Sequence, residues 1–323
     1  MCIVESQEHA KLRWILGLRF LVRKVDLECF GIIMENENKY GFIRDGYFEF
    51  EWVSLSDYRF FCRGLKPPGD SKIIVCLIHG QGEHSGRYAH LANYLHQHSI
   101  GFMSFDLRGH GRSHGKRGHT PNCDILMEDL SSFVAEVIIR FPDHEIFLYG
   151  HSMGGNLVAR FAIEKNPPIS GVILSGAWFK LAFEPSPEKL IIGNLLNKIW
   201  PSFKIKTGLK SSQLTRDDEF RNRYKGDKLS HRYISARLFD CIRQNSRWVI
   251  DNAKHLSTPL LVMHGTEDKV TDLKSSFEFA SRVPDKAEFK AWEGYYHELH
   301  NDTNFEKVLE YVVSWILARV INS

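Results

Sequence analysis

The feature that most constrains the fold is a series of short apolar runs that alternate along the chain with amphipathic helical patterns. Apolar, β-branched runs of this length are typical of strands buried on both faces, as in a parallel sheet covered by helices. We predict such strands at residues 72–80, 100–106, 145–150, 171–176, 259–265 and 287–294. The alternation therefore predicts an α/β fold with a mostly parallel central sheet and helices on both faces. Residues 47–65 precede this series and suggest two strands joined by a short turn.

One interval breaks the alternation. About 80 residues separate the strands at 171–176 and 259–265, where an ordinary crossover needs about a dozen. The interval has helical patterns of its own, such as KLIIGNLLNKIW at 189–200. We therefore predict an inserted helical cap over residues 177–253, between a first core part (46–176) and a second core part (254–323).

Residues 1–45 lie outside this order. The stretch 11–25 mixes five basic residues with large apolar ones, but these spread around the helical wheel and form no single stripe. It lacks the long apolar stretch and the small-residue cleavage site of a signal peptide. We expect a disordered or loosely docked N-terminal extension, with Met34 as an alternative natural start. No run approaches the roughly 18 apolar residues that a membrane span needs.

Charge and cysteine usage exclude some classes of protein. The composition, 43% hydrophobic and 25% charged, is that of an ordinary soluble globular protein. A formal charge of +3, with no basic stripe interleaved with aromatics, argues against nucleic-acid binding. The six cysteines are scattered and form no C-x-x-C pair, so we expect reduced thiols in a reducing compartment, the cytoplasm.

The sequence Gly150-His151-Ser152-Met153-Gly154 fits G-x-S-x-G and lies directly between a predicted strand and a predicted helix. A sharp strand-to-helix turn lifts a serine hydroxyl away from the sheet, and its strain requires small flanking residues. The following helix N-terminus adds the backbone N–H of Met153, aimed at a developing oxyanion. We predict that Ser152 is a nucleophile. The alternative is a purely structural turn.

A second oxyanion donor is expected in the loop after the strand at 72–80. There His79-Gly80-Gln81-Gly82 lets the backbone double back, so that the N–H of Gln81 points at the same place. A glycine turn with no further role is the alternative.

The base and its orienting acid should follow the serine in the order acid, then histidine, at the ends of later strands. Glu267 or Asp268 follows the strand at 259–265, and Asp268 is favoured because it lies three residues past the closing glycine. His297 lies at the same offset from Gly294, which closes the last strand. These offsets predict that Ser152, Asp268 and His297 share one edge of the sheet.

Other histidines compete with this assignment. The spacing of His297 and His300 around Glu298 is close to a zinc-protease motif, but no third ligand has a suitable spacing. We therefore expect neither a metal nor a cofactor. Four further histidines at strand ends, His79, His110, His151 and His264, are interpreted as packing and hydrogen-bonding groups.

Several of these motifs together resemble the monoacylglycerol lipase and lysophospholipase family, α/β-hydrolases that are also grouped with the serine aminopeptidases. The resemblance covers about residues 47–320 and rests on HGQGEHSGRY, FDLRGHGRSHGKRG, GHSMGG, HGTEDKVTD and GYYHELHND. It implies the α/β-hydrolase fold, Ser152 as nucleophile, Asp268 rather than Glu267 as acid, His297 as base, and Gln81 and Met153 as backbone oxyanion donors. Gln81 departs from many relatives, which have a small or apolar residue there.

The resemblance implies hydrolysis of lipid monoesters through an acyl-enzyme. The segment KLIIGNLLNKIWPSF (189–203) would roof the site, which suits an acyl chain and transient contact of the cap with a membrane surface. The alternative is that these residues only pack the cap onto the sheet. The alternatives are a serine aminopeptidase, an acyltransferase or a non-lipid carboxylesterase on the same residues. An aminopeptidase would need an acidic group for the substrate amino terminus, and the cap offers Glu184, Glu188, Asp217 and Asp218.

Overall fold

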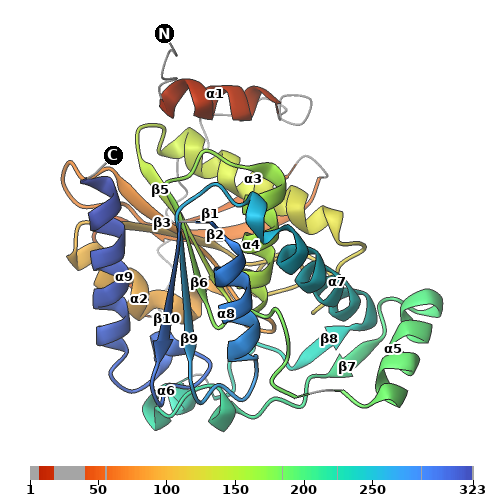
Figure 1. The fold of residues 1–323 in the computed structure, drawn as a ribbon. Coiled ribbons are helices and arrows are strands. Elements are labelled where there is room, and N and C mark those ends of the chain that lie inside the picture. Colours follow the sequence, from red (N-terminus) through yellow and green to blue (C-terminus); the bar gives the residue numbers. More distant parts are fainter. Residues whose placement is uncertain are drawn as a thin grey trace.

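A computed structural model of the chain describes residues 7–17, 41–54, 57–183, 185–223, 225–284 and 286–321. Its centre is an eight-stranded sheet with the strand order β1-β2-β4-β3-β5-β6-β9-β10 (Figure 1). The strands are β1 (Tyr47–Val53), β2 (Arg59–Leu65), β3 (Ile73–Ile78), β4 (Gly101–Phe105), β5 (Glu145–His151), β6 (Gly171–Ser175), β9 (Leu260–Gly265) and β10 (Ala287–Trp292). Strand β2 is antiparallel to both β1 and β4, and all other neighbours are parallel. The prediction of a mostly parallel sheet is confirmed.

Helices cover both faces of this sheet. Helices α3 (Asp124–Arg140), α4 (Met153–Lys165), α7 (Ala236–Asn252) and α8 (Leu273–Arg282) share one apolar cluster with it, and α2 (Ala89–Gln97) and α9 (Phe305–Val320) share a second. Strand β3 contributes side chains to both clusters because successive side chains of a strand point to opposite faces of the sheet. Its Ile74 and Cys76 join the first cluster, and Val75 and Leu77 join the second.

The segment predicted as a cap lies between β6 and β9. It contains α5 (Pro187–Ile199), β7 (Lys204–Lys206), the short helix η2 (Ser211–Gln213), α6 (Asp218–Arg223), β8 (Tyr233–Ser235), α7 and η3 (Ala253–His255). In Figure 1 its part from α5 to β8 lies beside the carboxyl ends of the parallel strands. Helix α7 falls within the predicted cap range, but it packs on α4 and places Leu238, Ile242 and Val249 in the core. The cap boundary at residue 253 therefore stays a prediction.

Of the N-terminal extension, residues 7–17 form helix α1 (Gln7–Gly17), and residues 1–6 and 18–40, with Met34, lie outside the described residues. The ammonium of Lys11 donates to the carbonyls of Pro142 and His144, and the indole N–H of Trp14 donates to that of Lys165. Helix α1 therefore docks at the end of the molecule opposite the cap (Figure 1). In the part of the chain that the structure describes, no helix has the length and apolar character to cross a membrane.

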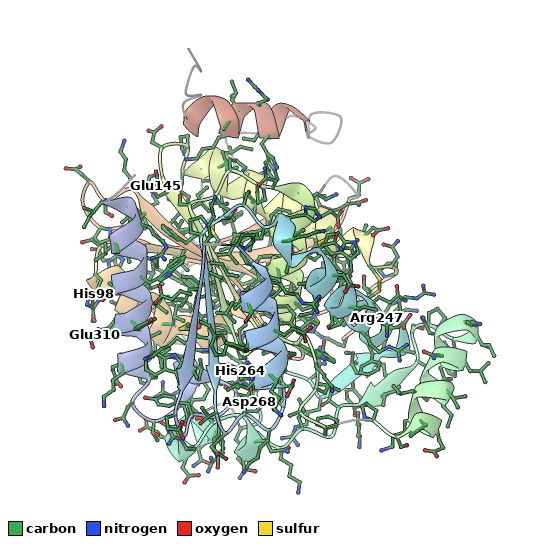
Figure 2. All side chains as sticks on the ribbon, in the orientation of Figure 1. His98, Glu145, Arg247, His264, Asp268 and Glu310 are labelled. Carbon is green, nitrogen blue, oxygen red and sulfur yellow. A yellow bond between two sulfur atoms is a disulfide. The ribbon has the colours of Figure 1, made fainter. Side chains whose placement is uncertain are left out.

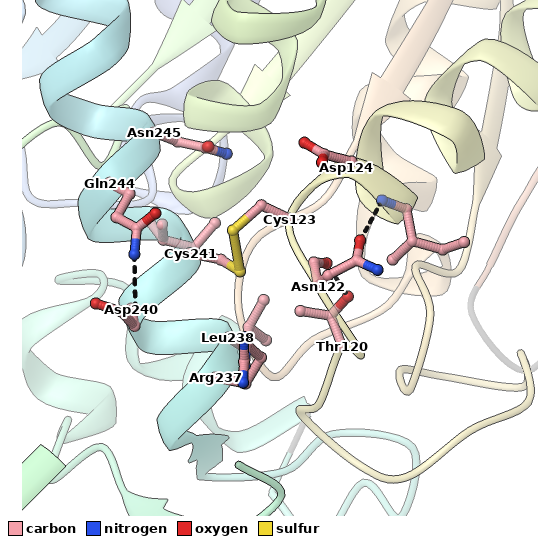
Figure 3. The surroundings of a disulfide bond; sticks show 12 residues. Thr120, Asn122, Cys123, Asp124, Arg237, Leu238, Asp240, Cys241, Gln244 and Asn245 are labelled. Atoms are coloured by element: carbon pink, nitrogen blue, oxygen red, sulfur yellow. Dashed lines mark hydrogen bonds between the residues drawn. A yellow bond between two sulfur atoms is a disulfide. The ribbon is translucent and has the colours of Figure 1, made fainter. Parts of the chain in front are cut away.

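The prediction that the cysteines are reduced thiols is wrong for one pair. Cys123, directly before α3, forms a disulfide with Cys241 of α7, and their Cα atoms are 5.2 Å apart (Figure 3). The bond joins the core to the cap segment. The expectation of a reducing compartment rested on reduced cysteines, so the disulfide leaves that expectation without support. Cys62 and Cys76 are free and buried, whereas Cys2 and Cys29 lie outside the described residues.

Candidate active site

Ser152 lies at the tip of a sharp turn between β5 and α4. Its backbone φ of 53° and ψ of −116° lie in a region that costs a residue with a side chain about 1–3 kcal/mol. The turn is possible because its flanks lack side chains. A Cβ at Gly154 would lie 2.0 Å from the carbonyl oxygen of Ile78, and one at Gly150 would lie 2.6 Å from the Cα of Gly155. The turn holds the Ser152 side chain at the carboxyl end of the sheet.

The structure brings the three predicted side chains together. The Nε2 of His297 lies 2.9 Å from the Oγ of Ser152, and its Nδ1 lies 2.7 Å from the Oδ2 of Asp268. Because Asp268 accepts the Nδ1–H, Nε2 is left to accept the serine proton. The positions of these residues after β5, β9 and β10 thus correctly predicted that the three side chains lie together.

Asp268 is held by more partners than sequence reasoning identified. Its Oδ1 accepts the backbone N–H groups of Val270 and Thr271, and its Oδ2 accepts the Thr271 hydroxyl. The Nε2 of His264 lies 3.1 Å from the same Oδ2, and Figure 2 shows both residues at the end of β9. His264 was interpreted only as a hydrogen-bonding group near a loop. The sequence signal that could have indicated this contact is the position of His264, four residues before Asp268.

The hydrogen bonds and charges separate the pKa values of the acid and the base. Burial raises the pKa of Asp268, but the charge of His297 and hydrogen bonds from His264 and His297 outweigh it and hold that pKa well below its usual range. Burial lowers the pKa of His297, but the charge and hydrogen bond of Asp268 outweigh it and raise that pKa above its usual value. The pair therefore suits a carboxylate that stays ionised beside an imidazole able to take up a proton.

The two predicted oxyanion donors belong to segments next to the serine: Met153 follows it directly, and a Cβ at Gly80, the residue before Gln81, would lie 3.1 Å from the Cβ of Ser152. Neither the backbone N–H of Gln81 nor that of Met153 donates a hydrogen bond to another described residue. The loop that carries Gln81 is fixed by Glu83, which is buried and accepts the N–H of Gly80 and the hydroxyl of Tyr88. We call residues 80–84 the oxyanion loop. Sequence reasoning did not identify Glu83.

The cap segment is bonded directly to the oxyanion loop. The Gln81 side-chain amide donates to the carbonyl of Tyr233 at 2.7 Å, and the N–H of His231 donates to the carbonyl of Gly82 at 2.8 Å. A third link joins the Nε2 of His84 to the Oδ2 of Asp227 at 2.6 Å. The side chain of Gln81 thus contacts the cap.

A cavity of about 970 Å³ opens beside Ser152, between the sheet and the cap. Its apolar lining comes from both sides and includes Trp178, Leu181, Leu190, Ile205, Ile234 and Phe239. A cavity of this size that combines apolar walls with polar and charged side chains suits a small organic ligand that has both an apolar and a polar part.

Among the described residues, no histidine other than His297 forms a hydrogen bond with the Ser152 hydroxyl. His300 is fully buried, stacks on Tyr88 and makes an edge-to-face contact with His151. Burial and the nearby His297 lower the pKa of His151 to about 3. Among the described residues, no group of three or more histidine, cysteine and acidic side chains is arranged to hold a metal ion.

Comparisons with known proteins agree with this geometry. The family model described as serine aminopeptidase, S33, matches residues 69–304. A monoacylglycerol lipase of Mycolicibacterium smegmatis is 30% identical over 79% of this chain and 91% of its own length, and a monoglyceride lipase of Mus musculus is 32% identical over 83% and 90%. An uncharacterized abhydrolase domain-containing protein of Dictyostelium discoideum is 37% identical over 77% of this chain, which spans only 27% of that protein.

Solved structures give the same result. The crystal structure of Paleococcus ferrophilus monoacylglycerol lipase matches with a TM-score of 0.74 and 29% identity over 80% of this chain and 99% of the other. A soluble variant of Saccharomyces cerevisiae monoglyceride lipase, in complex with a substrate analog, matches with a TM-score of 0.72 and 26% identity over 81% and 92%. The chain therefore belongs to the serine aminopeptidase S33 family of α/β-hydrolases, which includes the monoglyceride lipases, and it is a serine hydrolase of carboxylic esters.

Proposed function

We propose that this enzyme hydrolyses lipid monoesters through an acyl-enzyme on Ser152, with His297 as base and Asp268 as orienting acid. The observation that carries the proposal is the continuous hydrogen-bond chain from Asp268 through His297 to Ser152 beside a largely apolar cavity. Lipases for monoglycerides among the relatives support the same class of substrate.

In the first half of the reaction, the Oγ of Ser152 attacks the ester carbonyl while the Nε2 of His297 takes its proton. The oxyanion forms between the free N–H groups of Gln81 and Met153, and the loss of one such donor typically costs about 10²–10³ in rate. His297 then protonates the leaving alcohol, and the serine stays acylated. Asp268 holds the imidazole in the required tautomer and stabilises the imidazolium throughout.

In the second half, water enters the position of the departed alcohol. His297 accepts a proton from the water as it attacks the acyl carbonyl, and then returns that proton to Ser152. The products are a carboxylic acid and the regenerated hydroxyl group. Apart from water, the reacting groups are the side chains of Ser152, Asp268 and His297 and the backbone N–H groups of Gln81 and Met153.

The charges in the cavity favour a lipid over a peptide. An aminopeptidase needs a free carboxylate for the substrate amino group, but each acidic residue that lines the cavity is already bonded. Glu83 and Glu298 both bind Arg87, Asp227 binds His84, and Asp240 binds Asn197 and Gln244. Glu188, Asp217 and Asp218 do not line the cavity, and Glu184 lies outside the described residues.

We also propose that helix α5 of the cap contacts a lipid surface, which would make the enzyme peripheral at a membrane. None of its residues is buried, and large apolar side chains recur on it at helical spacing. Ile191, Leu195 and Ile199 are 67%, 55% and 73% exposed and follow one another at four-residue intervals. An exposed apolar patch beside the opening of a lipid site suits the delivery of a substrate from a bilayer.

The experiment that tests the proposed function is a substrate panel on purified protein. It compares monoacylglycerols, lysophospholipids, short p-nitrophenyl esters and aminoacyl amides at equal concentration. We expect the highest kcat/KM on the long-chain lipid monoesters. A higher kcat/KM on the amides would contradict the proposal and favour the aminopeptidase, and a preference for short esters would favour a non-lipid carboxylesterase. An added alcohol acceptor that is acylated faster than water attacks would reveal an acyltransferase.

A further inference from the structure

The charged residues around the cavity are unevenly balanced. Its four acidic residues have the partners named above. Of its basic residues, Arg87 is paired with these acids and Arg221 with Asp218. Lys189 of α5, Lys206, Lys225 and Arg232 also line the cavity, are exposed, and have no side-chain partner among the described residues. We call Lys206, Lys225 and Arg232, which lie between α5 and α7, the rim cations.

The rim cations lie on the part of the cap that is bonded to the oxyanion loop. Arg232 stands between His231, whose N–H binds Gly82, and Tyr233, whose carbonyl binds Gln81. Its own carbonyl accepts the N–H of Thr207, so the residue after Lys206 is its cross-strand neighbour. Lys225 lies two residues before Asp227, which is paired with His84 of the loop. The rim cations therefore belong to segments of the cap that are hydrogen-bonded to the oxyanion loop or directly adjoin such a segment.

The apolar lining and the rim cations suit chemically different parts of one ligand. The apolar wall suits an acyl chain, and the cations suit an anion on the leaving-alcohol side of the ester. In a lysophospholipid, only the three glycerol carbons separate the ester oxygen from the phosphate, so a phosphate must lie near the oxyanion loop when the ester is bound there. Arginine provides a planar fork that matches phosphate oxygens, and lysine adds point charges.

We propose that the rim cations Lys206, Lys225 and Arg232 form a subsite for the phosphate of a lysophospholipid headgroup. The proposal rests on the proposed ester hydrolysis at Ser152 and extends it by naming the chemistry of the leaving alcohol. The enzyme then prefers an anionic lysophospholipid to a neutral monoacylglycerol with the same acyl chain.

The test compares 1-oleoyl-lysophosphatidate with 1-oleoylglycerol in mixed micelles of a non-ionic detergent, which keeps the lipid surface uncharged. We expect the wild type to have the higher kcat/KM on the anionic substrate. In K206Q/K225Q/R232Q, the ratio of the two values should fall by about tenfold, as expected for three partly exposed ion pairs. Arg232→Lys keeps the positive charge but lacks the planar guanidinium, so its ratio should lie between those of the triple variant and the wild type.

The matched control is Arg247→Gln on α7, an exposed arginine that does not line the cavity (Figure 2). It should leave the ratio unchanged. Added sodium chloride should lower the ratio of the wild type, because screening weakens exposed pairs. This arm needs no variant, so it remains decisive if the triple substitution fails to fold.

Three outcomes would overturn the subsite. The triple variant could retain the wild-type ratio, Arg247→Gln could lower it equally, or inorganic phosphate could inhibit with an affinity at least equal to that of the lysolipid, which would mark a site for free phosphate. In each case, turnover of 1-oleoylglycerol that depends on Ser152 would leave the proposed function intact. Absence of turnover on both lipids would instead contradict the proposed function itself.

Discussion

At the scale of single residues, the site depends on the opposite pKa shifts of two buried neighbours. Asp268 remains ionised because the charge of His297 and its hydrogen bonds outweigh burial, and the same contact raises the pKa of His297. A base must be neutral to accept the proton of Ser152. The imidazole is neutral at alkaline pH, and the raised pKa moves the loss of activity on the acid side to a higher pH.

We predict that kcat/KM for a p-nitrophenyl ester falls as the pH decreases through the raised pKa of His297, with an inflection above the ordinary histidine value of 6.5. Asp268→Asn should move this inflection to lower pH, because the charge that raises the pKa is removed, and should lower kcat by about 10³–10⁴. Steady-state rates from pH 5 to 9 check both effects. An unshifted inflection in Asp268→Asn would show that another group titrates.

The principal site residues could be predicted from the sequence because each follows a strand that ends at the same edge of the sheet. Ser152, Asp268 and His297 needed only the strand positions and the flanking glycines, and the resemblance removed Glu267 as an alternative. His264 and Glu83 were not identified as partners of the site. The first is a residue of a buried strand and the second a loop acid, so their roles follow only from contacts made in three dimensions.

At the scale of elements, long periodic segments were predictable and short ones were not. The helical patterns at 124–140 and 273–282 predict helices with the same ends as α3 and α8, and the buried strands agree with their predicted ranges to within about two residues. Strands β7 and β8 were missed because three residues are too few for an apolar alternation, and all of β7 is exposed. These two strands nevertheless carry or adjoin two of the rim cations, so the missed elements bear on specificity.

We predict that replacing Ile191, Leu195 and Ile199 by serine weakens binding to lipid vesicles without lowering the turnover of a water-soluble short ester. Each exposed apolar side chain transfers from water to the lipid boundary on binding, so the polar replacements remove that favourable transfer. Vesicle co-sedimentation and p-nitrophenyl acetate hydrolysis measure the two effects. Unchanged vesicle binding would exclude α5 as the contact surface.

At the scale of the whole molecule, the disulfide joins two parts of the chain that sequence order separates. Cys123 and Cys241 are 118 residues apart, and the loop that they close contains Ser152 and most of the cap. The pairing could not be predicted, because scattered cysteines with no framework spacing do not reveal which of them meet in the fold. Hydrogen bonds between His119 and Ser235, and between Gly118 and Ser235, hold the same junction.

We predict that reduction of Cys123–Cys241 lowers the unfolding temperature. The chain-entropy model gives about 4–5 kcal/mol as the stabilisation from closing a loop of this length. Thermal unfolding with and without a dithiol reductant measures the effect, and C123S/C241S, which lacks the bond, is the control that should not respond to the reductant. Equal unfolding temperatures for the oxidised and reduced wild type would contradict this role.

The central claim is that Ser152 carries the acyl group. The most direct measurement treats the native protein with a fluorophosphonate probe, which transfers its phosphonyl group to an activated serine with loss of fluoride, and locates the added mass by peptide mapping. We predict a single label on Ser152, and no label and no ester hydrolysis in a folded Ser152→Ala variant. A label on another residue, or undiminished ester turnover by Ser152→Ala, would contradict it.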